Sequence, residues 1–369
     1  MNWVYKIGYY QLTKPKEKAD DWIIILDESI QLGKDKILLI LGIRESEIDF
    51  NRPLKYSDLI PLKLISKETW NGELIYELLQ NLEDELGNIK YAVGDYGSDL
   101  KKGLSLAEIP HIHDITHKIA LILEKIYKND SNYKEFTDQM SKMRSKYSQS
   151  DIAYIIPNKQ RKKSRYQNIK TISDWGLKAL SFLEKNQNHD KNNSSEESTE
   201  RDIKAIDTLQ WLKNYEPTIK ELSEMNGVIN KVEKEVKSNG LSHKTIGSSK
   251  TLLSKLHTTR GMELRKGIID YFNDTIELLP KVFREFKQIL CTSDIIESSF
   301  GKYKNYTSNN PMAGVTKLAL ALPAFTSSLD EEEIKEALET TTFDDIKEWA
   351  EKNIGETLFQ KRSKALSYT

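Results

Sequence analysis

A strongly apolar run that ends on acidic residues restricts the fold of this chain more than any other feature. Residues 22–30 read Trp-Ile-Ile-Ile-Leu-Asp-Glu-Ser-Ile. A short, unbroken apolar run of this kind is typical of a buried strand. A turn follows at 33–36, and a second apolar run returns over 36–43. Together the two runs predict a buried antiparallel hairpin, and therefore a sheet at the centre of the fold.

The next segments alternate between strand and helix patterns. A short strand is predicted at 62–65, and apolar residues at helical spacing predict a helix over 70–86 that Gly87 ends. Further strands are predicted at 89–93 and 111–115, followed by a helix over 119–127. Strands that alternate with helices indicate an α/β sheet domain. Three leading antiparallel strands followed by parallel units predict a ribonuclease-H-like mixed five-stranded sheet.

The remaining chain has a helical pattern, apart from a brief strand predicted at 152–156. Residues 186–200 are polar and of low complexity, which predicts a mobile loop. Helices are predicted over 270–290 and 294–303, with Ser293 as the N-cap of the second. We therefore expect a large all-helical insertion and a helical C-terminus. The expected segments are a linker or remnant at 1–20, a first core part at 21–125, the insertion with its basic patch at 126–289, a second core part at 290–325 and an acidic helical tail at 326–369.

The charge of the chain is unevenly distributed. Lys and Arg number 55 against 56 Asp and Glu, so the net charge of −1 excludes a histone-like polycation. The last forty residues hold eleven acids and six bases, whereas residues 152–173 hold six bases and no acid. A near-zero total can thus conceal a basic patch. The single cysteine, Cys291, excludes an internal disulfide and a cysteine-cluster zinc site. No apolar run has the length of a membrane span and no signal peptide is evident, so we expect a cytoplasmic protein that makes no membrane contact.

Two aspartates follow predicted strands that should be neighbours. Asp27 lies at the end of the first strand and Asp95 at the end of the fourth. In the predicted strand order these two strands lie side by side, and ligands of open α/β sheets bind at the carboxyl ends of strands. Two adjacent carboxylates repel each other unless a divalent cation lies between them, and Mg²⁺ prefers such oxygen ligands. We therefore predict a metal site there, for which two ions would suit phosphoryl transfer.

Glu297 is the predicted third carboxylate. On a helix, Asp294, Glu297, Gly301 and Lys304 share one face, so a glutamate and a lysine could hold metal and a DNA phosphate together. His117, in Asp-Ile-Thr-His, is predicted to position a phosphate or water near this site. His111, His113 and His117 could instead suggest zinc, but no fourth ligand is evident.

Basic residues predicted to contact DNA form a block in the insertion and a pair after Glu297. Basic side chains neutralise phosphates, and nearby aromatic residues can stack on unpaired bases. The predicted contacts are Lys159, Arg161, Lys162, Lys163, Arg165, Lys302 and Lys304.

Each of these residues also has an ordinary structural interpretation. An aspartate after a strand is often a turn or cap residue, Glu297 alone is a surface glutamate, and His117 could simply be a satisfied histidine at a helix start. The basic block could be a solvated surface. The combination on one strand order favours the functional interpretation.

Taken together, these motifs resemble those of bacterial insertion-sequence transposases of the DDE type. The resemblance rests on Asp27 in Ile-Leu-Asp-Glu-Ser, on Asp95 in Val-Gly-Asp-Tyr-Gly-Ser-Asp and on Glu297 in Asp-Ile-Ile-Glu-Ser-Ser-Phe-Gly-Lys-Tyr-Lys. Residues 14–22 and 114–118 are similar as well, so the resemblance covers about residues 5–325. The helical stretch between Asp95 and Glu297 resembles the insertion of hAT-type members, which carry Cys-x-x-His where this chain has Asp114-x-x-His117.

The resemblance implies an enzyme that cleaves DNA and transfers the cleaved strand. Asp27, Asp95 and Glu297 would bind two Mg²⁺ ions, for which Mn²⁺ would substitute. The implied partners are double-stranded transposon ends and target DNA, bound by a homodimer or a higher oligomer, and the protein would be associated with the nucleoid when on DNA. Relatives carry a helix-turn-helix domain before the core, but only 26 residues precede Asp27 here. We expect that domain to be absent, truncated or encoded separately, and truncation could leave the enzyme inactive. Two alternatives stay open: a non-catalytic DNA-binding relic or regulator of transposition, and a plain nuclease on the same fold.

Overall fold

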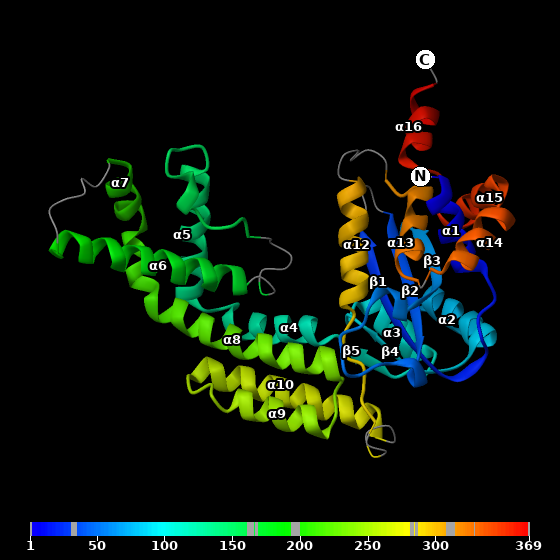
Figure 1. Ribbon diagram of the computed structural model, residues 1–369, viewed down its shortest axis with the longest axis horizontal. Helices are drawn as coiled ribbons and strands as arrows, with labels where there is room; N and C mark the ends of the chain where they lie inside the picture. Colours follow the sequence, from blue (N-terminus) through cyan, green and yellow to red (C-terminus); the bar gives the residue numbers. More distant parts are fainter. Residues whose placement is uncertain are drawn as a thin grey trace. The chain divides into compact units, whose positions relative to one another are not determined.

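In the computed structural model, the chain divides into two compact units. The structure describes residues 2–30, 35–160, 166, 169–192, 200–280, 284, 287–307, 314–327 and 329–367. The sheet unit comprises residues 1–114, 237–242 and 275–369, and the helical unit comprises residues 115–236 and 243–274. Figure 1 shows the helices and strands of both units. In the described part of the chain, no helix is long and apolar enough to cross a membrane.

The sheet unit is built on five strands in the order β3-β2-β1-β4-β5. Its strands are β1 (Ala19–Ile30), β2 (Lys36–Arg44), β3 (Ile60–Lys67), β4 (Gly87–Gly94) and β5 (His111–His113). The first three pair antiparallel, whereas β4 runs parallel to β1 and β5 runs parallel to β4. This is the strand order and direction of the predicted ribonuclease-H-like mixed sheet, so the predicted fold class is confirmed.

One face of the sheet is covered by α2 (Gly72–Leu86) and α3 (Ser98–Leu106). Trp22, Ile24 and Leu26 of β1 pack in a single apolar core with residues of these two helices. Helix α2 starts at Asn71, whose side chain accepts a hydrogen bond from the Leu74 amide at 2.9 Å. Since side chains alternate along a strand, the odd-numbered residues of β1 point to the other face.

Gly87 allows the chain to pass directly from α2 into β4. It caps the helix with φ of 94°, a conformation that L side chains rarely adopt. A Cβ at this position would lie 2.5 Å from the carbonyl oxygen of Ala19, the residue of β1 that pairs with Gly87. The predicted stop signal therefore both ends the helix and permits close pairing of the two parallel strands.

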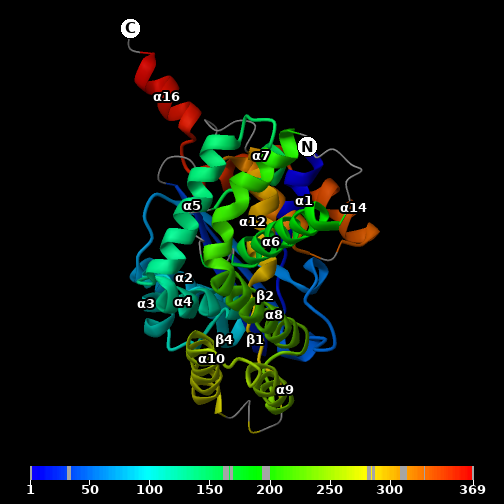
Figure 2. The same ribbon diagram turned by 90° about the vertical axis from the view of Figure 1, so that its left-hand side faces the viewer.

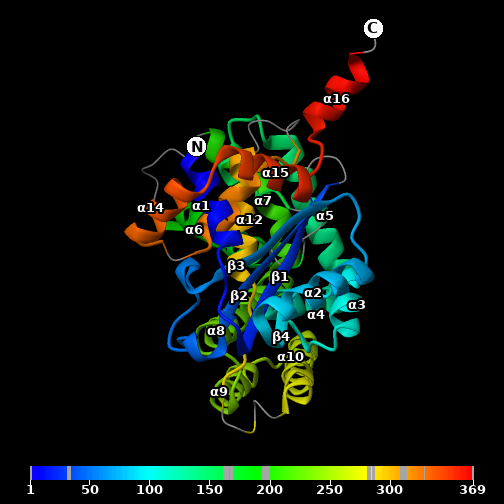
Figure 3. The ribbon, with the colours of Figure 1, turned by 90° about the vertical axis from the view of Figure 1, so that its right-hand side faces the viewer.

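Helix α12 (Asp294–Thr307) packs against β1. Figure 3 shows it across the sheet from α2 and α3. The segment before it is fixed to the sheet, because the Leu290 amide donates a hydrogen bond to the Tyr91 hydroxyl at 2.9 Å. Leu241 and Ile289 also form an isolated antiparallel bridge. The second core part, which the chain reaches only after residue 275, thus returns to the face of the sheet that α2 and α3 leave uncovered.

The N-terminal residues, which we expected to form a linker, instead form helix α1 (Asn2–Thr13). Its buried residues Tyr5 and Ile7 pack with residues from the C-terminal part of the chain, including Leu320 and Ala324. The helices that surround α1 are η6 (Lys317–Leu320), α13 (Ala321–Phe325), α14 (Glu331–Thr340) and α15 (Phe343–Asn353), and α16 (Leu358–Leu366) follows them. The acidic tail is helical, as predicted, but α14 and α15 belong to a packed layer with α1.

Within the residues that the structure describes, the helical unit is formed by helices and contains no β-strand (Figures 1 and 2). The brief strand predicted at 152–156 is wrong, because residues 153–155 form a 3₁₀ turn and no described strand in this unit could pair with them. The predicted loop at 186–200 is partly helical, because α6 continues to Asn192 and α7 begins at Glu200; residues 193–199 lie outside the described residues. The helices are α4 (Ile115–Tyr127), α5 (Ser131–Tyr147), α6 (Ile169–Asn192), α7 (Glu200–Leu209), α8 (Glu216–Asn239), α9 (His243–Leu253) and α10 (Thr259–Leu278), with 3₁₀ turns at η3 (Ala153–Ile155) and η5 (Gln210–Tyr215).

Candidate active site

Three aspartates lie at corresponding positions of the three parallel strands: Asp27 is within β1, whereas Asp95 and Asp114 directly follow β4 and β5. The register pairs Ile25 of β1 with Val93 of β4, and Val93 with Ile112 of β5. Asp27, Asp95 and Asp114 each lie two residues beyond one of these partners. This equal offset gives the three residues matching register positions on neighbouring segments. Asp95 directly follows β4, as predicted, but Asp27 does not end the first strand, because β1 continues past it to Ile30.

Asp114 is the one of these three aspartates that sequence reasoning did not include in the metal site. Its side chain is fully buried, and its Oδ2 accepts hydrogen bonds from the Ser293 amide at 2.7 Å and from the Ser293 hydroxyl at 3.1 Å. The Asp114 amide donates to the Gly94 carbonyl at 2.9 Å. Asp114 thus connects the ends of β4 and β5 to the residue that precedes α12. The signal that could have revealed it was a third carboxylate directly after a strand.

Glu297 lies in the first turn of α12, one turn after Ser293. Asp114 and Glu297 each offer a carboxylate oxygen as a potential ligand, and these oxygens lie within 4.8 Å of each other. His117 follows Asp114 by three residues, in the first turn of α4. Glu297 is thereby brought to the end of β5, where the two carboxylates could bind a metal ion. Asp27 and Asp95 are not part of this cluster.

Other acidic residues add to the negative potential at this edge. Burial raises the pKa of Glu28, and the neighbouring carboxylates of Asp99 and Asp95 raise it further, against the opposing effect of Lys36. Lys36 and Glu28 form an ion pair at 3.1 Å. The Asp27 Oδ1 accepts the Glu28 amide at 2.7 Å, and the Asp95 Oδ1 accepts the Gly97 amide at 3.1 Å. A concentration of carboxylates at one strand end favours a bound cation.

Aromatic and imidazole rings flank Asp95. The ring of Tyr96 stacks on His113 at a centroid distance of 4.0 Å and lies 4.5 Å from the ring of His111. The Tyr96 hydroxyl donates to the His111 carbonyl at 2.9 Å. Burial lowers the pKa of His111 to about 4, with Lys101 acting in the same direction and the Asp95 backbone opposing it. His111 is therefore a neutral imidazole at neutral pH, and it adds no positive charge beside Asp95.

The predicted DNA contacts fall into three groups. Lys302 and Lys304 are exposed on α12, within two turns of Glu297. Lys159 is exposed after η3 in the helical unit. The predicted contacts Arg161, Lys162, Lys163 and Arg165 lie outside the described residues.

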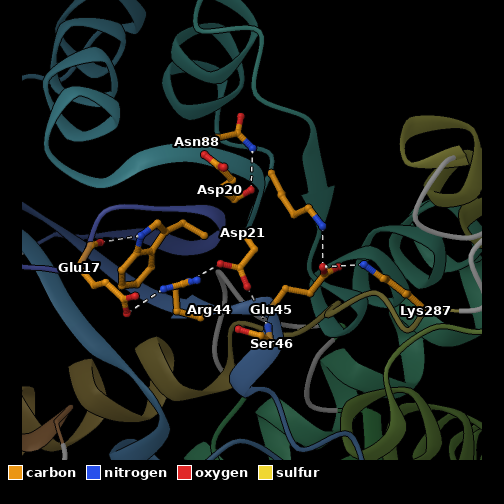
Figure 4. A network of polar contacts seen from close by, with 10 residues as sticks. Glu17, Asp20, Asp21, Arg44, Glu45, Ser46, Asn88 and Lys287 are labelled. Carbon is orange, nitrogen blue, oxygen red and sulfur yellow. Dashed lines mark hydrogen bonds and ion pairs between the residues drawn. The ribbon is translucent and has the colours of Figure 1, made fainter.

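A second polar cluster lies at the other end of the sheet, where β1 and β4 begin (Figure 4). Lys90 and Lys287 both contact the Glu45 carboxylate, with N–O distances of 2.5 and 3.4 Å. Arg44 pairs with Asp21, and with Glu17 at 2.8 Å. These side chains line an open cavity of about 730 Å³. Because the cations and carboxylates of this cluster are paired with each other, we interpret it as a structural ion network that joins β1, β2 and β4.

Comparison with solved structures finds a similarity at low sequence identity. The chain is similar to a solved structure titled "Drosophila P element transposase strand transfer complex", with a TM-score of 0.44 and 12% sequence identity, over 90% of this chain and 85% of that chain. No protein-family model matches the sequence. No curated protein matches it either.

Proposed function

We propose that this protein is a metal-dependent DNA strand-cleaving and strand-transferring enzyme of the DDE transposase type. The observation that carries the proposal is the equal offset of Asp27, Asp95 and Asp114 along three adjacent parallel segments, with Asp27 within β1, Asp95 and Asp114 directly after β4 and β5, and Glu297 within reach of Asp114. The motif resemblance to insertion-sequence transposases supports the same conclusion. In this proposal Asp27, Asp95 and Glu297 are the catalytic carboxylates, as the sequence predicts.

The donor set fits hard divalent cations. Carboxylate oxygens are the preferred ligands of Mg²⁺ and also suit Mn²⁺. We assign Asp27, Asp95 and Glu297 as the residues that would hold two Mg²⁺ ions, and Asp114 as the residue that orients the helix start next to Glu297. When bound, such ions stabilise the entering and leaving oxygens of phosphoryl transfer.

The proposed reaction has two displacement steps at phosphorus. A water oxygen forms a bond to the scissile phosphorus, and the bond from that phosphorus to the 3′-oxygen breaks, leaving a 5′-phosphate and a 3′-hydroxyl that takes up a proton. The 3′-hydroxyl then loses its proton and attacks a phosphorus of target DNA, so that one phosphodiester forms as another breaks. His117 would position the attacking water or the phosphate, as the sequence predicts.

Lysines on α12 would position the DNA backbone beside the carboxylates. Lys302 and Lys304 follow Glu297 by five and seven residues on the same helix, and both are exposed. Lys159 and the basic block that follows it would bind DNA through the helical unit. Such contacts neutralise phosphates and displace counterions, so the proposed binding should weaken steeply with salt. Binding to two DNA ends would occur as a homodimer or a higher oligomer.

The test is nicking of a supercoiled plasmid that carries the genomic DNA flanking the coding sequence, with Mg²⁺ or Mn²⁺. The parent protein should nick and join this DNA. The cleavage rates of Asp27→Asn and Glu297→Gln should be lower by a factor of 10² or more, because each substitution removes about several kcal/mol of transition-state stabilisation. Glu73→Gln is the matched control, because Glu73 is an exposed acid of the same unit that pairs with Lys102 on the far face. Equal cleavage by all three variants would falsify the carboxylate assignment. Cleavage without joining would identify a plain nuclease.

A further inference from the structure

A tyrosine outside all the motifs above contacts the helix that carries Glu297. Tyr56 lies in η2 (Tyr56–Asp58), immediately before β3. Its hydroxyl donates a hydrogen bond to the Ser298 hydroxyl at 2.6 Å. The ammonium of Lys302 lies over the Tyr56 ring, 3.9 Å from the ring centroid. All these residues belong to the sheet unit.

The turn that carries Tyr56 is held by charged contacts. The Asp58 carboxylate accepts the Lys55 amide at 2.7 Å and two guanidinium hydrogen bonds from Arg52, at 2.5 and 2.9 Å. Although burial raises the pKa of Asp58, its hydrogen bonds with Arg52 and Lys55 lower the pKa below the usual value. Arg52 also pairs with Asp49 at 3.1 Å. Two-point Arg–carboxylate contacts fix geometry, so the Tyr56 ring is held on a rigid support.

Both contacts of Tyr56 fall on one face of α12. Ser298 and Lys302 are four residues apart, and residues at this spacing are neighbours on a helix surface. Ser298 directly follows Glu297, so the face that Tyr56 contacts lies beside the candidate catalytic carboxylate. A cation 3.9 Å from a ring centroid is within the distance at which the ring quadrupole attracts it. Without the ring contact, the Lys302 side chain would sample many rotamers and would lose that conformational freedom when it bound a ligand.

We propose that Tyr56 is a positioning residue that holds the Lys302 ammonium ready for a DNA phosphate next to Glu297. This inference rests on the proposed function, because it assigns a ligand beside the same site. The ring attracts the ammonium without using its three N–H donors, so Lys302 remains able to bind a phosphate oxygen. The ring of Tyr56 is the active element, and its hydroxyl serves to hold the ring against Ser298.

The experiment is a double-mutant cycle on binding of a fluorescein-labelled 30-base-pair duplex, measured by anisotropy in EDTA. Lys302→Gln should weaken binding and lower the slope of log affinity against log salt by about 0.9, the value of one phosphate contact. Tyr56→Leu should weaken binding about two- to five-fold. In the Lys302→Gln background, Tyr56→Leu should not weaken DNA binding further, because the ammonium that Tyr56 would position is already absent. In the Lys304→Gln background, the matched control, its full effect should persist.

Tyr56→Phe keeps the ring but removes the hydroxyl that holds it, and it should weaken DNA binding less than Tyr56→Leu does. The thermal midpoint of each variant, measured alongside, identifies loss of folding. The inference is overturned if Tyr56→Leu binds like the parent, or if its loss is the same in both lysine backgrounds. The proposed function has a separate readout: if the Tyr56–Lys302 coupling is present but the parent never nicks plasmid DNA with Mg²⁺ or Mn²⁺, the lysine contact stands and the catalytic proposal falls.

Discussion

Replacing Asp114 tests whether the start of α12 depends on a buried carboxylate. Asp114 is 0% exposed, and its Oδ2 accepts both the amide and the hydroxyl of Ser293. Hydrogen bonds to a charged group contribute about 1.5–3 kcal/mol each, and a buried donor left without a partner costs more than its bond contributed. Asp114→Ala should therefore lower the free energy of unfolding by about 3–5 kcal/mol, a large part of the ~5–15 kcal/mol that stabilises a typical protein.

The assay is urea denaturation followed by circular dichroism in EDTA, so that metal binding does not contribute. Asp330→Ala is the matched control, because Asp330 is also an aspartate before a helix, and its Oδ1 accepts the Glu333 amide at 2.7 Å on an exposed surface. That cap should contribute only about 1 kcal/mol. Ser293→Ala, which removes the hydroxyl but keeps the amide, should fall between the two. If Asp114→Ala costs no more than Asp330→Ala, the buried carboxylate does not hold α12 and the argument is refuted.

Two further predictions concern pH and packing. Because burial lowers the pKa of His111 from 6.5 to about 4, the unfolded chain binds a proton that the folded chain does not. The free energy of unfolding should thus fall by about 3 kcal/mol as the pH drops from 6.5 to 4. The measurement is the free energy of unfolding against pH for the parent and for His111→Gln. The same fall in both proteins would exclude His111 as its cause. A Cβ at Gly8 would overlap the Leu320 carbonyl oxygen, whereas one at Gly301 meets no atom within 4 Å. In calorimetry, Gly8→Ala should lower the thermal midpoint by several degrees, whereas Gly301→Ala should stabilise the protein by up to about 1 kcal/mol. If Gly8→Ala were the more stable of the two variants, this would contradict the packing of α1 on η6.

The core of the sheet was predictable because its signals are local. The apolar residues of 22–26 and 36–43 avoid contact with water only if both segments are buried. Gly87 lies at the boundary between a helical pattern and a strand pattern, so a few residues are enough to locate that boundary. The predicted adjacency of the first and fourth strands is present as the pairing of β1 with β4, although Asp27 lies within β1 and not at its end. These inferences needed only neighbours in the sequence or in the sheet.

What the sequence did not reveal depends on partners far along the chain. Residues 2–13 looked like a linker because their buried face is short, and the residues that cover it lie mainly in helices that begin at Lys317 or later. Asp114 looked like a simple cap, since its partner Ser293 is 179 residues away. Tyr56 carried no motif, and its contact with Ser298 spans 242 residues. Pattern reasoning has no access to such pairings until the chain is folded.

The contact between Asp114 and Ser293 also sets an order of events during synthesis of the protein. Asp27, Asp95 and Asp114 are made early, but Ser293, which contacts Asp114, follows 179 residues after it. At about 5–20 residues per second, a ribosome needs roughly 10 to 40 s to cover that distance. During this interval the nascent chain carries the aspartates and the sheet but not the glutamate. A growing chain therefore has no complete set of proposed catalytic carboxylates until the segment with Glu297 has been made.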